Sequence, residues 1–185
     1  METEIYLLRH GETEWTKSGK HTGNTDIELT DIGEEQAAFL GRRLPKFDLV
    51  LCSPKIRAVE TCRLAGIRHF IEDADAVEWD YGSYEGLTHT QIIAKDPAWN
   101  LFKNGAPGGE SVVQAAERAR RLLEKVKGKG KVAIFSHGHF LRMMAVAWLN
   151  VKPEMATHLY LSVASFSILG FERQTPVIRL WNETN

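Results

Sequence analysis

The sequence has few of the features that mark secreted, membrane or metal-binding proteins. It contains only two cysteines, Cys52 and Cys62, and no Cys-x-x-Cys or Cys/His spacing typical of a metal site. Because one lies in a predicted strand and the other in a predicted helix, buried free thiols of a cytosolic protein are expected rather than a disulfide. No apolar run approaches the length that spans a bilayer. These absences predict a cytoplasmic protein without a metal site.

The sequence also lacks a strong charge of either sign. The formal net charge is −1, so neither a nucleic acid nor an acidic membrane surface is an expected partner. Residues 1–4 are acidic and lead directly into a predicted strand, which differs from a signal peptide. Hydrophobic residues make up 43% of the chain, and no repeat or linker interrupts it, so residues 1–185 are predicted to form a single domain.

Short apolar runs alternate with amphipathic segments. Three runs, 5–8, 48–52 and 132–135, lack polar alternation, which is typical of strands buried on both faces. Further predicted strands cover 70–79, more weakly, and a closing pair at 165–171 and 177–181. Helices are predicted over 31–44, 55–65, 112–126 and 138–148, and 90–102 is predicted to hold one or two short helices broken at Pro97. This alternation predicts an α/β fold with a mainly parallel sheet.

Several helix starts carry their own signals. Thr30 is a predicted N-cap, and Ser111 with Gln114 forms a predicted capping box. Ser53-Pro54 is predicted to cap and open the helix over 55–65. The segment 14–28 has no periodicity and is predicted to be an ordered loop, and a loop of that length is usually functional.

Two of the buried strands end in His-Gly, at His10 and at His137. Parallel strands place their carboxyl ends at one edge of a sheet, so these two imidazoles are expected to lie close together. Arg9 precedes the first histidine, and Arg57 lies one turn into the helix after the strand over 48–52. An arginine guanidinium makes paired hydrogen bonds to phosphate, so this group of residues predicts an anion-binding site.

Each of these residues also has an ordinary structural interpretation. A single arginine on a helix is usually solvated or paired, and a single buried histidine usually serves packing. Taken alone, Glu78 would be interpreted as a solvated carboxylate at a strand end. The convergence of Arg9, His10, Arg57 and His137 at the ends of three buried strands is what favours a site over these interpretations.

The motifs resemble those of the histidine phosphatase superfamily, in its phosphoglycerate mutase-like branch. Arg9-His10-Gly11-Glu12-Thr13 is similar to the signature of that family, and the similarity continues through nearly the whole chain. Its other parts are Trp15, Thr22-Gly23, Asp26, Leu29-Thr30, Gly33, Ser53-Pro54, Arg57-Ala58, Thr61, the acid motif over 78–86, Gly109-Glu110-Ser111 and Ser136-His137-Gly138. Segments 78–88 and 135–142 are most similar to small acid phosphatases and to sedoheptulose bisphosphatase.

The resemblance implies a three-layer α/β/α fold and a phosphohistidine mechanism that uses no cofactor. His10 would attack phosphorus while neutral. Arg9, Arg57 and His137 would hold the phosphoryl oxygens, and Glu78 would protonate the leaving alcohol and then activate water.

Substrate contacts are carried over from the family in the same way. Thr22, Gly23 and Gly138 match family positions that contact substrate. Thr16 stands where the mutases commonly carry asparagine, and its hydroxyl can still donate a hydrogen bond. The implied partner is a small phosphate ester, a sugar phosphate or a phosphorylated organic acid. A homodimer is expected only because dimers are frequent among enzymes of this size.

Three alternatives remain beside a phosphatase. A mutase must shield its phosphohistidine from water, and the short stretch between Glu78 and Gly109 and the few residues after the last predicted strand argue against such a cover. A non-catalytic phosphate-ester binding protein would have been favoured by loss of His10 or Glu78. A metal hydrolase using His10, His137 and His139 lacks supporting carboxylates. Candidate rim residues for substrate choice are His21, Asn24, Tyr81, Ser83, Tyr84, Phe102 and Lys103.

Overall fold

Residues 3–184 are described by the computed structural model; Met1, Glu2 and Asn185 lie outside the described residues. The strands are β1 (Glu4–Arg9), β2 (Leu49–Cys52), β3 (Ile71–Glu72), β4 (Lys131–Ser136), β5 (Phe166–Glu172) and β6 (Thr175–Glu183). The helices are α1 (Glu14–Lys17), α2 (Asp31–Gly41), α3 (Ile56–Leu64), α4 (His89–Ile93), α5 (Leu101–Asn104), α6 (Val112–Val126) and α7 (Gly138–Trp148). Short 3-10 turns are η1 (Ala74–Ala76), η2 (Gly82–Tyr84) and η3 (Pro153–His158).

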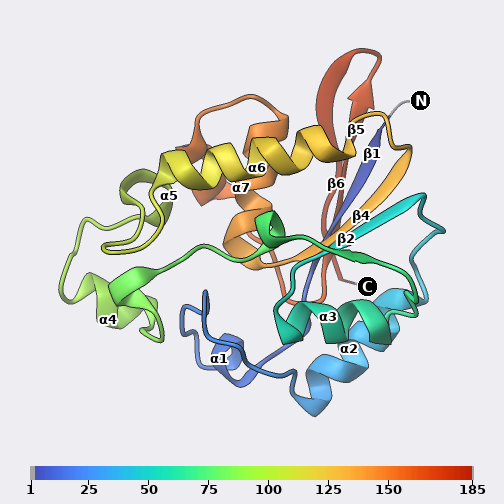
Figure 1. The fold of residues 1–185 in the computed structure, drawn as a ribbon. Coiled ribbons are helices and arrows are strands. Elements are labelled where there is room, and N and C mark those ends of the chain that lie inside the picture. The colour runs from blue at the N-terminus through green and yellow to red at the C-terminus, as the bar shows by residue number, and fades with distance from the viewer. Residues whose placement is uncertain (1–2, 185) are drawn as a thin grey trace.

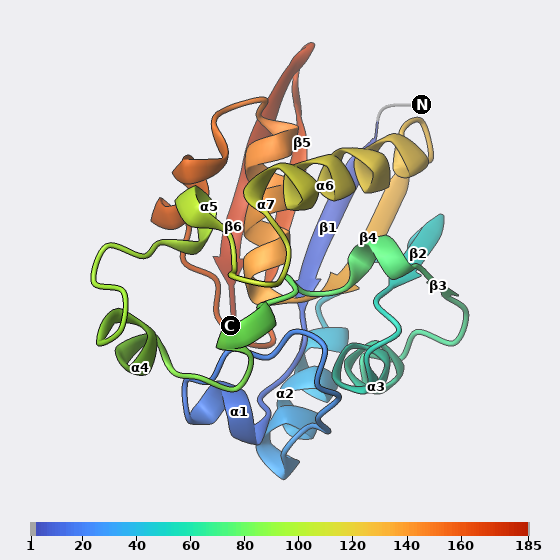
Figure 2. The ribbon, with the colours of Figure 1, turned by 60° about the vertical axis from the view of Figure 1, so that its left-hand side comes forward.

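The strands form one six-stranded sheet in the order β3-β2-β4-β1-β5-β6 (Figure 1). The four strands from β3 to β1 are parallel, whereas β5 and β6 add an antiparallel hairpin at one side. Helices α6 and α7 cover one face of the sheet, and α2 and α3 cover the other (Figure 2). The predicted α/β class, with helices on both faces of a mainly parallel sheet, is confirmed.

The apolar run of β1 explains why the sheet needs cover on both faces. Ile5 and Leu7 belong to the hydrophobic core under α6 and α7, whereas Tyr6 and Leu8 belong to the core under α2 and α3. Successive side chains of a strand point to opposite faces, so a strand between two helical layers must be apolar at every position.

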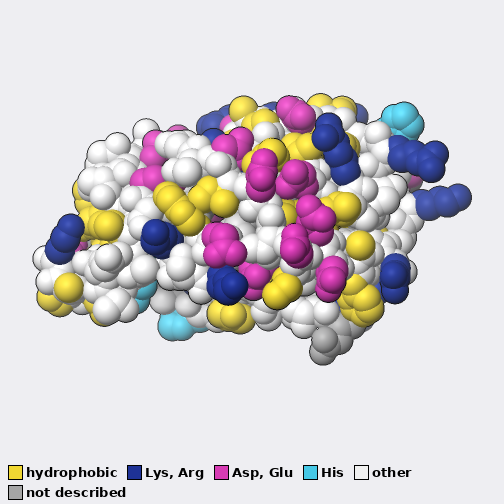
Figure 3. All heavy atoms as spheres, turned by 90° about the horizontal axis from the view of Figure 1, so that it is seen from below, with side chains coloured by type: hydrophobic (Ala, Val, Ile, Leu, Met, Phe, Trp, Pro, Cys, Tyr) yellow, Lys and Arg dark blue, Asp and Glu magenta, His cyan; other side chains and the backbone are white. Residues whose placement is uncertain are grey.

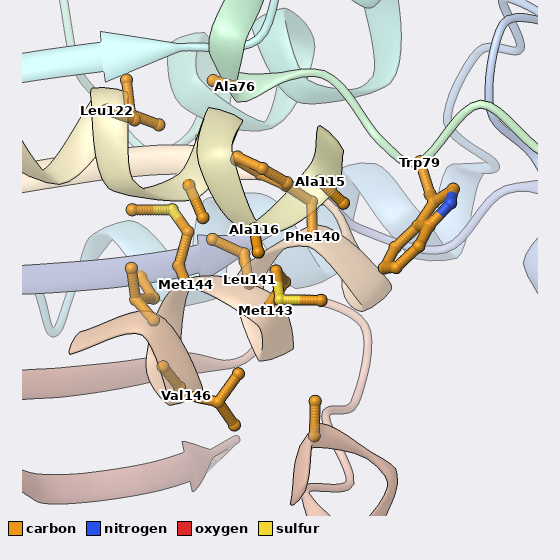
Figure 4. Close-up of a cluster of buried hydrophobic side chains, with 14 of the residues drawn as sticks. Ala76, Trp79, Ala115, Ala116, Leu122, Phe140, Leu141, Met143, Met144 and Val146 are labelled. Carbon is orange, nitrogen blue, oxygen red and sulfur yellow. The ribbon is translucent and has the colours of Figure 1, made fainter. Parts of the chain in front are cut away.

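The core between α6 and α7 is packed from short and long side chains that interleave. Figure 4 shows Ala115, Ala116 and Leu122 of α6 facing Phe140 and Met144 of α7. All five are buried. The small alanines let the two helices approach closely, and the larger residues fill the space between them. This contact fixes α7, the helix whose first turn forms part of the site described below.

Several boundaries differ from those predicted from the sequence. Thr30 caps α2 and Ser111 caps α6 as predicted, but α2 ends at Gly41 instead of residue 44. A short capped helix, α1, stands inside the predicted loop over 14–28. The weak strand over 70–79 is reduced to the two residues of β3, and β6 extends beyond the predicted range. Ser53 does not cap α3, because the N-cap is Lys55 and no side chain caps it.

The surface below α1, α2 and α3 carries a group of acidic side chains, as Figure 3 shows. The first turn of α2 carries Asp31 and Glu34, where negative charge complements the helix dipole. Such a face would repel polyanions. Within residues 3–184, no helix has the length and apolarity needed to cross a membrane.

We expect Leu122→Ala to lower the free energy of unfolding by about 2–5 kcal/mol, because it opens a cavity in the core between α6 and α7. Val113→Ala on the same helix is the matched control, since Val113 is 65% exposed and should change stability by about 0.5 kcal/mol or less. Urea denaturation measures the change in the free energy of unfolding for both variants. Equal effects of the two substitutions would contradict the assignment of the core face.

Candidate active site

The register of the sheet aligns the ends of three strands. Arg9 of β1 lies opposite Ser136 of β4, and Phe135 of β4 lies opposite Cys52 of β2. The residues that follow these strands, His10, His137 and Ser53, therefore meet at one edge. The ring centroids of His10 and His137 are 5.2 Å apart. The juxtaposition of two imidazoles thus follows from strand register alone.

His10 lines a cavity, and within residues 3–184 only one of its ring nitrogens makes a hydrogen bond. Its Nδ1 is 2.7 Å from the carbonyl oxygen of Gly11. A carbonyl oxygen only accepts, so Nδ1–H donates, and the lone pair of Nε2 is left free in the neutral ring. Burial, together with the positive charges of Arg57 and Arg9, holds the pKa of His10 well below its ordinary value. His10 is therefore a neutral imidazole with a free Nε2.

Arg57 is fully buried and organises the space behind His10. Its Nε donates to Nδ1 of His137 at 3.1 Å, and its two terminal nitrogens donate to the carbonyl oxygens of Thr22, Gly23 and Thr25. An arginine cannot accept a hydrogen bond, so His137 Nδ1 is unprotonated and Nε2–H points to Ser53 Oγ at 2.8 Å. Burial and the charge of Arg57 also hold the pKa of His137 well below its ordinary value.

Glu78 belongs to the segment between η1 and η2, contacts the first turn of α7 and is 7% exposed. Its Oε1 accepts the backbone N–H of Trp79 at 2.9 Å and of Phe140 at 2.8 Å, and its Oε2 accepts that of His139 at 3.0 Å. The carboxylate thus satisfies N–H groups that a helix N-terminus leaves without intrahelical partners. Arg118 holds the same segment from behind, donating to the carbonyl oxygens of Val77 and Glu78.

Arg9 crosses the start of α7, and one of its N–H donors, Nε, has no hydrogen-bond partner among the described residues. A Cβ on Gly138 would lie 3.1 Å from Arg9 Cζ, so a glycine at this position lets the guanidinium lie against the backbone. Arg9 Nη1 donates to the carbonyl oxygen of Leu161, and Nε is buried without a hydrogen-bond partner among the described residues. An unpartnered cationic donor beside His10 is suited to an anion.

The cavity above His10 has a volume of about 320 Å³. Its walls come from the ends of β1 and α7 and from loops far apart in the sequence. It is lined by Arg9, His10, Thr16, Gly19, Lys20, His21, Thr22, Glu78, Tyr81, His89, Gly138, His139, Arg142, Tyr160 and Leu161.

The predicted site residues fall into a set that lines the cavity and a set that lies behind its wall. Arg9, His10, Thr16, Thr22, Glu78 and Gly138 line the cavity, whereas Gly23, Arg57 and His137 lie behind it. The Thr16 hydroxyl is also engaged locally, because it completes a capping box with Thr13. Among the predicted rim residues, His21 and Tyr81 line the cavity and Phe102 lines an adjoining lobe, whereas Ser83, Tyr84 and Lys103 line neither. Asn24 lines a separate cavity, on the side of Asp80 and Arg118.

Sequence reasoning missed Lys20, His89, Arg142, Tyr160 and Leu161. For Arg142 a signal exists, because it follows Gly138 by four residues on a predicted helix, and helical side chains lean toward the N-terminus. The other four approach from loops or short helices that no periodicity predicts.

His139 is held neutral by its surroundings. Burial raises the pKa of Tyr81 well above its ordinary value, so its hydroxyl keeps its proton and donates to His139 Nδ1 at 2.5 Å. Burial, followed by the charge of Arg142, holds the pKa of His139 well below its ordinary value. Among residues 3–184, no group of three or more His, Cys, Asp or Glu side chains is arranged to hold a metal ion.

Comparison with known proteins gives consistent results over the whole chain. A model of the histidine phosphatase superfamily (branch 1) matches residues 5–184. An acid phosphatase of Mycobacterium tuberculosis is 41% identical over 95% of this chain and 92% of its own length. Sedoheptulose 1,7-bisphosphatase of Saccharomyces cerevisiae is 32% identical over 78% of this chain and 67% of its own.

Solved structures superpose on this chain over nearly its whole length. The product of an open reading frame of Mycobacterium tuberculosis superposes with a TM-score of 0.95 at 38% identity, over 100% of this chain and 99% of its own. A phosphoserine phosphatase of Entamoeba histolytica, in complex with 3-phosphoglyceric acid, superposes with a TM-score of 0.85 at 29% identity, over 99% of this chain and 98% of its own.

We expect the stability of the protein to fall as the pH drops below about 6.5, because His10, His137 and His139 stay neutral in the folded state and are protonated in the unfolded state. A histidine pKa that folding lowers makes the unfolded chain bind more protons, so stability is complete above the unfolded pKa and is lost toward acid. Each histidine contributes up to about 1.4 kcal/mol per pH unit.

Urea midpoints between pH 5 and 7.5 measure this slope. The exposed His69 provides the control, since His69→Gln should leave the slope unchanged. A midpoint that is constant across this range would show that the three imidazoles accept protons inside the fold.

Glu85 fixes the loop that holds Arg57. Its carboxylate accepts the backbone N–H of Gly23 at 2.9 Å and of Thr25 at 3.0 Å, and the carbonyl oxygens of the same loop accept from Arg57. We expect Glu85→Ala to speed hydrogen exchange of the Gly23 and Thr25 amides roughly ten- to hundredfold, because hydrogen bonds to charged groups are lost. Glu35→Ala, at an exposed position of α2, is the control, and equal protection in both variants would contradict this role.

Proposed function

The chain belongs to the histidine phosphatase superfamily and is a phosphatase of that superfamily, and from this premise we propose that it hydrolyses phosphomonoesters without a metal ion, through a phosphohistidine on His10. The observation that carries the proposal is the state of His10. Its Nδ1–H is committed to a carbonyl oxygen, and its free Nε2 belongs to a neutral ring that lines the cavity. A nucleophile must be unprotonated to attack, and this arrangement keeps Nε2 so.

The arginines supply positive charge for the phosphoryl group. Arg9 lines the cavity together with His10, and Arg57 contributes its charge from behind. The Nε2–H of His137 is donated to Ser53 behind the cavity wall, so a phosphoryl oxygen would take over this donor only by displacing the Ser53 hydroxyl. Phosphoryl transfer depends mainly on such positioning and on stabilising the charge that spreads over the phosphoryl oxygens.

Glu78 is the proposed general acid and base. In the first step Nε2 of His10 bonds to phosphorus, the bond from phosphorus to the ester oxygen breaks, and Glu78, which must carry a proton at this step, delivers it to that oxygen. In the second step water attacks phosphorus, Glu78 takes its proton, and the bond to nitrogen breaks to release phosphate. The three backbone hydrogen bonds to Glu78 fix its carboxyl group on the cavity wall for both steps.

The proposed substrates are sugar phosphates and phosphorylated organic acids. The similarity to a sedoheptulose bisphosphatase and to a phosphoserine phosphatase bound to 3-phosphoglyceric acid supports these two classes. Thr16 and Thr22, on the cavity wall, are proposed to contact the substrate together with Gly138. Gly23 lies behind the wall, so its proposed contribution is the carbonyl oxygen that holds Arg57.

We expect the purified protein to release phosphate in excess EDTA, and His10→Ala to abolish release because the nucleophile is lost. Glu78→Gln should lower kcat/KM for alkyl phosphates about 10²- to 10⁴-fold. The same variant should affect p-nitrophenyl phosphate far less, because p-nitrophenolate leaves without a proton. Phosphate release over a panel of sugar phosphates, phosphoserine and 3-phosphoglycerate measures these effects.

His69→Ala, an exposed histidine, is the matched control and should retain full activity. Activity that disappears with EDTA would contradict the metal-independent reaction. Conversion of 3-phosphoglycerate to 2-phosphoglycerate with little free phosphate, after priming with 2,3-bisphosphoglycerate, would identify a mutase instead.

A further inference from the structure

The cavity above His10 continues into a second lobe of about 220 Å³. The two share His21, His89, His139 and Arg142. The wall of the second lobe is largely aromatic: the ring of Phe102 lies 5.6 Å from His139, and that of Trp99 lies 5.6 Å from His21. This lobe is the space that the alcohol part of a phosphate ester would enter when its phosphoryl group lies at His10.

Arg142 is the cation that faces both lobes, and its guanidinium is held in a fixed position. Its Nε and Nη2 donate to the carbonyl oxygen of Ala156 at 3.0 and 2.7 Å, and Nη2 also donates to that of Thr157. The guanidinium carbon lies 4.6 Å from the centre of the Phe102 ring. These contacts use one edge of the guanidinium, and the N–H groups of Nη1 make no hydrogen bond within residues 3–184.

Arg142 forms no direct contact with a carboxylate within residues 3–184. Among the described residues none forms an ion pair with it, and the carboxylate of Glu78 is already bonded to three backbone N–H groups. Burial lowers the pKa of Arg142 to about 10, so the group is still charged at neutral pH. The imidazole of His139 beside it is neutral. The lobe therefore keeps a positive charge that forms no ion pair within residues 3–184, although the Glu78 carboxylate nearby favours the charged form of Arg142.

We propose that Arg142 binds a second anionic group of the substrate, so that the enzyme prefers phosphate esters that also carry a carboxylate or another phosphate. This inference rests on the proposed phosphatase function and narrows its substrate class. A fixed, half-free guanidinium suits a carboxylate or phosphate oxygen because little side-chain freedom is lost on binding. Lys20, which also lines the main cavity, is exposed and lies over the Trp15 ring, so its position is less constrained.

Two pairs of substrates test the proposal. Phosphoserine and phosphoethanolamine differ in one carboxylate, and fructose 1,6-bisphosphate and fructose 6-phosphate differ in one phosphate. We expect the native protein to prefer the more anionic member of at least one pair, as a ratio of kcat/KM values. Arg142→Gln should reduce that ratio roughly ten- to hundredfold, the loss expected for hydrogen bonds between charged groups. The pair that responds shows whether the second group is a carboxylate or a phosphate.

Arg142 also ties α7 to η3, so a loss of folding must be separated from a loss of specificity. A ratio of two substrates cancels any general decline in activity, and Arg142→Lys, which keeps the charge, should retain part of the preference. Lys103→Gln is the matched control, because Lys103 lies on α5 next to the lobe and lines neither cavity. Thermal denaturation of all three variants shows whether they fold.

The proposal is overturned if the native protein shows no preference in either pair, or if Arg142→Gln keeps the preference. Absence of phosphate release from all four compounds by the native protein would instead overturn the proposed phosphatase function. The two failures are therefore distinguishable in one experiment.

Discussion

A buried guanidinium that has no carboxylate partner is the constraint on which the site depends. Removing a charge from water costs several kcal/mol unless polar groups replace the lost solvent. Arg57 is fully buried and forms no ion pair among the described residues, so its solvation comes from three carbonyl oxygens of the 22–25 loop and from His137 Nδ1. The loop must therefore hold one shape for α3 and β4 to bring their residues together, and Glu85 holds it from the other side.

The start of α7 is the second organising feature. Its free N–H groups would attract an anion, and Glu78 occupies part of that position with its own carboxylate. The proposed acid is thus held by backbone groups of the same turn that carries Gly138 and presents His139 to the cavity. The core between α6 and α7 fixes this turn relative to the sheet, so packing far from the cavity determines where the carboxyl group lies.

Much of this arrangement could be predicted from the sequence, for identifiable reasons. The apolar runs of β1, β2 and β4 and their carboxyl-terminal residues are local signals, and parallel pairing alone brings His10 and His137 to one edge. The role of Ser53 was not predictable. A serine before proline is typical of a helix cap, whereas the Ser53 hydroxyl accepts a hydrogen bond from His137, 84 positions later. Lys20 and Tyr160 reach the cavity through loop paths that depend on tertiary contacts.

The cavity separates charged from neutral groups by a simple physical rule. Burial lowers the pKa of every cationic side chain, and arginine begins about six pKa units above histidine. The same environment therefore leaves Arg9, Arg57 and Arg142 charged while His10 and His137 stay neutral. Each arginine charge then lowers the pKa of a neighbouring imidazole further. A lysine in place of Arg57 would begin with a lower pKa and would lose its proton more readily in this site. Positive charge for the proposed phosphoryl group and a neutral imidazole as the proposed nucleophile can thus coexist in one site because one residue type resists deprotonation and the other does not.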